Sequence, residues 1–171
     1  MVRRLSIALA VSVAVLAIAI ASTTAASPTT YVTSLSGEEE VPFRETRAHG
    51  AAVFQLSPDG TELSFRLIAS NIDNVVAAHI HLGPPDCACP VVAFLYGSVP
   101  AGGGSQDGVL STGTITAADL IGDLTGMPLS ALIDEIEAGN TYVNVHTNDG
   151  VDPTNTGPGD FPGGEIRGQI D

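Results

Sequence analysis

The sequence predicts an all-β protein, an antiparallel β-sandwich or barrel with one short helical insertion. Apolar and polar residues alternate with a period of two in several short runs, and Gly, Pro, Asn or Asp bounds each run. A helical period occurs once, between residues 129 and 136. Short strands joined by turns at this spacing are typical of sandwiches and barrels.

The clearest local element is a hairpin over residues 50–69. Its two arms, residues 50–56 and 62–69, alternate, and Pro58, Asp59 and Gly60 between them favour a turn. The other expected strands are residues 29–35, 75–82, 90–96, 109–116, 141–146 and 165–170.

One helix interrupts the strands. Leu129, Leu132, Ile133 and Ile136 recur at the spacing of one helix face, and Gly139 is suited to end the helix. We expect this helix to pack across one end of the sheet. A shorter turn over residues 117–120 precedes it.

Residues 1–26 resemble a secretory signal peptide. Arg3 and Arg4 precede an apolar core over residues 5–21, and small residues follow at the expected cleavage site. An uncleaved N-terminal anchor is the alternative. After cleavage we expect one domain, residues 27–171, secreted to the outside of the cytoplasm and free of the membrane.

The mature chain is strongly acidic. Of six basic residues, Arg3 and Arg4 leave with the leader, so four arginines face 19 Asp and Glu residues. This balance argues against a nucleic-acid partner and favours solubility and attraction for cations.

Two histidines lie one residue apart in an apolar run. On a strand, His79 and His81 share one face, while Ile80 and Leu82 point to the other. His146 ends another strand-like run, so three imidazoles converge if the two strands are neighbours. Three imidazoles suit copper or zinc with an open fourth position. The alternative is that each histidine makes an ordinary structural hydrogen bond.

Cys87 and Cys89 are separated by a single residue. Three states are open: a local disulfide, which export favours, an intermolecular bridge, or soft ligands for a metal at the neighbouring histidines. Cys87, Cys89 and His49 are therefore the weaker candidates for a fourth metal ligand.

Acidic and basic side chains give further, weaker candidates. The expected strand over residues 165–170 places Glu165 and Arg167 on one face. There they are candidates to pair with polar groups beside the histidine strand and so to orient the metal ligands. The run 38–40 contains three glutamates, and we expect one to have a structural partner. The loop over residues 148–163 offers oxygen ligands for Ca²⁺ without the spacing of an EF-hand, so calcium is the less favoured ion.

Several motifs, in order, carry a resemblance to a known family. The sequence resembles the CHRD domain, a module first described in chordin and widespread in microbial secreted proteins. The motifs are Leu-Ser-Gly-Glu-Glu-Glu-Val-Pro at 35–42, Gly-Ala-Ala-Val-Phe at 50–54, Ala-His-Ile-His-Leu-Gly at 78–83, Pro-Val-Val at 90–92, Tyr-Val-Asn-Val-His-Thr at 142–147 and Gly-Gly-Glu-Ile-Arg-Gly-Gln at 163–169. The Cys-Ala-Cys insert and His49 depart from the family pattern.

The resemblance implies an immunoglobulin-like β-barrel or sandwich with a remote likeness to copper/zinc superoxide dismutases, and it brings no established activity. His79, His81 and His146 resemble three copper ligands of the dismutases. The bridging histidine and the zinc loop of those enzymes have no counterpart in this sequence.

Three functions remain open at this point. The first is a non-enzymatic, exported binding module with a transition metal on its histidine-rich strand face. The second is a copper-dependent enzyme of dismutase type, against which the negative charge argues because superoxide is an anion. The third is an extracellular protein-interaction or matrix module with structural histidines. No nucleophile elbow supports an acyl-transfer enzyme.

Overall fold

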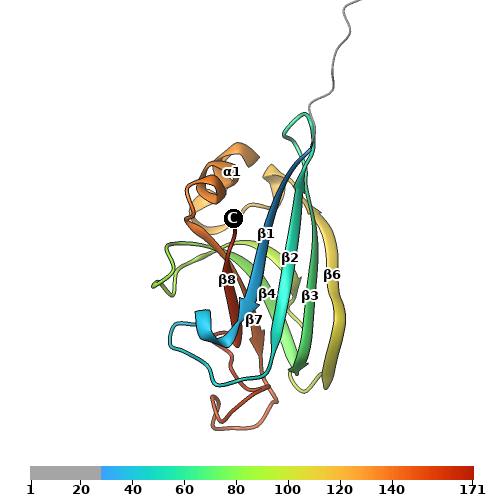
Figure 1. Cartoon of the computed structure of the whole chain (residues 1–171), viewed down its shortest axis with the longest axis vertical. Coiled ribbons are helices and arrows are strands. Elements are labelled where there is room, and N and C mark those ends of the chain that lie inside the picture. Colours follow the sequence, from blue (N-terminus) through green and yellow to red (C-terminus); the bar gives the residue numbers. More distant parts are fainter. Residues whose placement is uncertain (1–27) are drawn as a thin grey trace, which may run out of the picture.

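The computed structural model describes residues 28–171, and its strands form one antiparallel sheet that curls into a nearly closed barrel (Figure 1). The predicted all-β class with one short helix is confirmed. The strands are β1 (Thr29–Ser36), β2 (His49–Leu56), β3 (Leu63–Asp73), β4 (Val75–Leu82), β5 (Val91–Gly97), β6 (Ser105–Ile115), β7 (Thr141–Thr147) and β8 (Ile166–Gln169). The predicted signal peptide lies outside the described residues.

Strand order places segments from both halves of the chain side by side. The order is β5-β4-β7-β8-β1-β2-β3-β6, with antiparallel pairing between the neighbours. The two end strands approach each other, because the Ser111 hydroxyl on β6 donates to the Leu95 carbonyl on β5 at 2.7 Å. The strand that carries His79 and His81 therefore lies directly beside the strand that carries His146.

The predicted helix is α1 (Leu129–Glu137), and the four apolar residues whose spacing predicted it are all buried. It lies at one end of the barrel, near the C-terminus (Figure 1). Gly139 follows it with a φ of 70°, the left-handed conformation that lets glycine end a helix. Short 3-10 turns occur at η1 (Gly37–Glu39), η2 (Ala117–Asp119) and η3 (Gly122–Leu124).

The hydrophobic core fills the barrel and fixes which side chains face away from it. On β4, Ala78 and Ile80 are fully buried in the core, and on β7 Val143 and Val145 lie opposite them. Because side chains alternate along a strand, the histidines project from the other side of the sheet. We call this other side the polar face. Loops at residues 37–48, 83–90 and 148–165 cover it and are held there by the contacts described below.

Strand β6 begins earlier than the alternation predicts, at Ser105 rather than residue 109. Hydrogen bonds across β3 explain the extension: the Ser105 hydroxyl donates to Asp73, and the Asn71 amide donates to Asp107. Two register shifts between β3 and β6 accompany it. Such side-chain contacts leave no periodic signal in the sequence.

Gly168 lets β8 lie close to β1, and it supplies a test of the fold. A Cβ at this position would collide with the Ser34 carbonyl oxygen and the Thr33 hydroxyl. We expect Gly168→Ala to lower the free energy of unfolding by about 1–3 kcal/mol, measured by urea denaturation. Gly157→Ala is the matched control, because nothing lies within 4 Å of that Cβ. A change at Gly168 no larger than at Gly157 would contradict this packing.

Candidate metal centre

Three histidines meet on the polar face. His79 and His81 come from β4 and His146 from β7, where His146 pairs across from Ala77 and thus lies diagonally beside His79. One ring nitrogen from each residue lies within 4.8 Å of those of the other two. His81 and His146 are buried, at 7% and 9% exposure. The predicted convergence of the three imidazoles is therefore present in the structure.

Backbone carbonyls fix two of the three rings. The Nδ1–H of His81 donates to the Cys89 carbonyl at 2.7 Å, and the Nδ1–H of His146 donates to the Pro162 carbonyl at 3.0 Å. A carbonyl oxygen only accepts, so both rings carry their proton on Nδ1 and present an Nε2 lone pair. These are structural hydrogen bonds, and they also orient the rings as metal ligands commonly are oriented.

The third ring closes the cluster. His79 Nδ1 lies 3.1 Å from His146 Nε2, and because that Nε2 is an acceptor, His79 Nδ1–H donates to it. Ligand atoms on a tetrahedral zinc ion lie about 3.3 Å apart. An ion between these rings would replace the hydrogen bond at nearly the same separation.

Burial keeps all three imidazoles neutral. Desolvation, together with a smaller contribution from the neighbouring imidazoles, lowers the pKa of His79 to about 3 and that of His81 to about 4. Burial also lowers the pKa of His146. Neutral rings offer lone pairs at ordinary pH, which metal binding requires.

Aromatic and cationic side chains pack around His81. Its ring stacks on the Tyr142 ring with centroids 4.8 Å apart, and the Arg167 guanidinium carbon lies 3.4 Å over the same Tyr142 ring. Arg167 also donates to the Pro84 and Cys87 carbonyls, at 2.9 and 2.6 Å. Arg167 thereby holds the loop whose Cys89 carbonyl orients His81.

The two cysteines and the fourth histidine do not join the cluster. Cys87 and Cys89 form a disulfide with each other, so they offer no thiolate for a metal. His49 lies on β2, three strands away from β7 in the sheet order, and its Nδ1 contacts the Arg47 carbonyl. None of the three weaker fourth-ligand candidates therefore reaches the histidines as a ligand.

Glu165 is fully buried and serves the loops. It accepts hydrogen bonds from the Thr46 hydroxyl at 2.6 Å, the Thr147 hydroxyl at 2.7 Å and the Gly159 amide at 2.8 Å. Its carboxylate ties together residues 43–48 and 148–163 and makes no hydrogen bond to a histidine. Glu165 precedes β8 and Arg167 lies on it, and only Arg167 acts on the cluster, through the Cys89 loop.

The sequence did not predict that Glu40 and Asn144 meet beside the histidine cluster. Glu40 is 6% exposed, and its Oε2 accepts from the Val41 amide at 3.3 Å and from the Asn144 amide nitrogen at 3.5 Å. Burial raises the pKa of Glu40 to about 7. The family match of the glutamate run and the Val41-Pro42 that follows it were the clues, and they predicted a structural partner for one glutamate without saying which.

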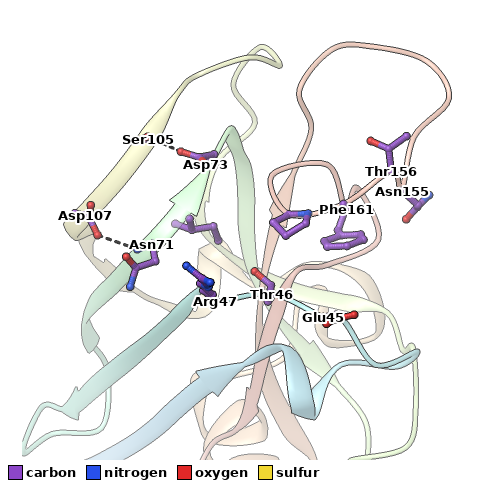
Figure 2. Close-up of a pocket in the computed structure, with 13 residues that line it drawn as sticks. Glu45, Thr46, Arg47, Asn71, Asp73, Ser105, Asp107, Asn155, Thr156 and Phe161 are labelled. Carbon is purple, nitrogen blue, oxygen red and sulfur yellow. Dashed lines mark hydrogen bonds between the residues drawn. The ribbon is translucent and has the colours of Figure 1, made fainter.

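A wide concavity lies where β3 ends and β6 begins (Figure 2). It has a volume of about 950 Å³ and is lined by polar side chains such as Thr46, Asn71 and Asp107, with Phe161 on the side of the 148–163 loop. None of the predicted transition-metal ligands lines it, and neither does Glu165 or Arg167. The groove is open and mixed in charge, and it holds no cluster of metal-ligating groups.

The fold and the site define an antiparallel β-barrel domain with a buried histidine cluster on its polar face. Comparison with known families matches the CHRD domain over residues 31–170. The chain belongs to the CHRD domain family, which confirms the resemblance seen in the motifs. Searches of curated proteins and of solved structures gave no match. Within residues 28–171, no helix has the length and hydropathy needed to span a membrane.

Glu40 provides a pH test of this description. The pKa of its carboxyl group is raised from 4.5 to about 7, because the native state favours the protonated form. The protonated carboxyl group therefore stabilises the native state fully below about pH 4.5, and this contribution is lost as pH rises through about 7. We expect Glu40→Gln, which keeps the neutral shape, to gain on the order of 2–3 kcal/mol over wild type between about pH 4.5 and 8.

The exposed neighbour Glu39 supplies the control, because Glu39→Gln removes the same charge from the surface. Chemical denaturation at several pH values measures both variants. Parallel pH profiles for Glu40→Gln and wild type would show that Glu40 is not buried as described.

Proposed function

We propose that this CHRD domain is an exported, non-enzymatic binding module that holds one copper or zinc ion on His79, His81 and His146. The observation that carries the proposal is the convergence of three neutral imidazoles within 4.8 Å, two of them fixed through Nδ1 by backbone carbonyls. The leader-like residues 1–26 and the family's occurrence in secreted proteins support export.

The surroundings of the His81 ring favour a metal-binding role for the cluster over a purely structural one. Its Nε2 is buried and has no hydrogen-bond partner within the protein. A buried acceptor without a partner is destabilising by about 1–3 kcal/mol, and native proteins rarely retain one without a reason. A metal ion that accepts the Nε2 lone pair supplies that reason.

The donor set restricts the ion. Three imidazole nitrogens suit zinc and copper, whereas calcium requires six or more oxygen ligands. Asp149 and Asp160, in the acidic loop, accept hydrogen bonds from the Val151 amide and from Thr156, so both already serve local turns. Calcium is therefore the less supported ion.

A copper enzyme of dismutase type has less support. The bridging ligand of such enzymes would require a fourth histidine, and His49 lies three strands away. The acidic surface also repels superoxide. A copper-loaded preparation that turns over superoxide faster than free copper would favour the enzyme over the binding module.

Metal content tests the proposal. We expect protein of residues 27–171 to bind one equivalent of copper or zinc after dialysis, and the double variant His79→Ala, His81→Ala to bind none, by elemental analysis. His49→Ala is the matched control and should keep full stoichiometry, because His49 is exposed and outside the cluster. Absence of metal from the folded wild type would leave the histidines structural.

The lowered pKa values predict how affinity varies with pH. The pKa of a His is about 6.5 in water, so at about pH 5.5 three ordinary imidazoles would each weaken binding about tenfold, about a thousandfold together. At this site protons compete little above about pH 5, because burial lowers the pKa of His79 to about 3 and of His81 to about 4.

We therefore expect the zinc dissociation constant to change by less than about tenfold between pH 7.5 and 5.5. Competition with a chromophoric chelator measures it. A loss of affinity near a thousandfold would mean that the three imidazoles titrate like imidazoles in water and are not buried as described.

A further inference from the structure

A small cavity borders the histidine cluster. Its volume is about 160 Å³, and Glu40, His81, Asn144 and Arg167 are among its lining residues. Three buried side-chain atoms around it have no hydrogen-bond partner within the protein: Glu40 Oε1, His81 Nε2 and Asn144 Oδ1. The described residues contain five such atoms, and three of them belong to residues that line this one cavity.

All three atoms are acceptors once Glu40 is ionised. Glu40 Oε1 is a carboxyl oxygen, Asn144 Oδ1 is the amide oxygen because Nδ2 faces Glu40 Oε2, and His81 Nε2 bears a lone pair because its proton is on Nδ1. An apolar occupant would leave them unsatisfied, and an anion would be repelled by the carboxylate. The cavity therefore fits an occupant that donates hydrogen bonds or accepts a lone pair.

The geometry around Gly164 shows that two of these acceptors converge. A Cβ on Gly164 would collide with Asn144 Oδ1 and Glu40 Oε1 together. Both oxygens therefore lie close to one point beside Gly164. The guanidinium of Arg167, on the cavity wall, disfavours a second free cation there.

We propose that the metal ion takes a water molecule from this cavity as its fourth ligand, with Glu40 and Asn144 as the acceptors of its two protons. His81 Nε2 then binds the ion, and one hydrated ion satisfies all three buried acceptors. A water occupies about 30 Å³, so the cavity has room for it. This inference rests on the proposed metal site and deepens it: the open position selects neutral, hydrogen-bond-donating ligands over anions.

Copper(II)-loaded protein tests the inference with azide as the anionic probe. Water-proton relaxation reports an exchangeable water bound directly to copper, and the azide-to-copper charge-transfer band reports anion binding. At about pH 8.5, where a carboxyl group with a pKa near 7 is ionised, we expect Glu40→Gln to bind azide about tenfold more tightly than wild type, because one repelling charge is gone. Glu39→Gln, which removes an exposed charge one residue away, should match wild type.

The outcomes separate the two proposals. Absence of bound copper overturns the metal site and this inference together. Full copper stoichiometry without an inner-sphere water in the wild type overturns the inference alone, and that measurement needs no variant. Equal azide affinities in Glu40→Gln and Glu39→Gln also overturn it. Bound copper, an inner-sphere water and tighter azide binding in Glu40→Gln alone support it.

Discussion

The pairing of β4 with β7 is the constraint on which the site depends. Ile80 lies opposite Val143 and Ala78 opposite Val145, all four buried in the core. A slip of one residue would exchange the two faces of a strand and move its histidines into the hydrophobic core. The apolar burial that stabilises the barrel therefore also fixes the histidines on the opposite, polar face. Core packing and site geometry are two consequences of one register.

The loops over the polar face orient the histidines that the strands bring together. The Cys89 and Pro162 carbonyls fix the proton on Nδ1 of His81 and His146, and Arg167 holds the first of these loops through the Pro84 and Cys87 carbonyls. The same covering removes the imidazoles from water, which lowers their pKa and keeps the rings neutral. A set of neutral, oriented imidazoles is what a transition metal requires, and little side-chain entropy remains to be lost on binding.

The sequence predicted the features that are periodic. Strand β4 was expected at residues 75–82 and runs over Val75–Leu82, and the helix period gave α1. Alternation placed His79 and His81 on one face. The cavity could not be foreseen, because Glu40, from the segment after η1, meets Asn144 of β7 through a contact between residues 104 positions apart. Strand order separates His49 from the cluster, and hydrogen bonds from Thr46 and Thr147 occupy the Glu165 carboxylate. Neither arrangement leaves a signal in the sequence.

Anomalous diffraction at the copper or zinc edge, from crystals of the metal-loaded protein, tests the central claim most directly. We expect one strong anomalous peak bounded by His79, His81 and His146, with His81 and His146 bound through Nε2 and their Nδ1 hydrogen bonds to the Cys89 and Pro162 carbonyls intact. A peak at His49 or on surface carboxylates, with the three imidazoles free of metal, would contradict the claim.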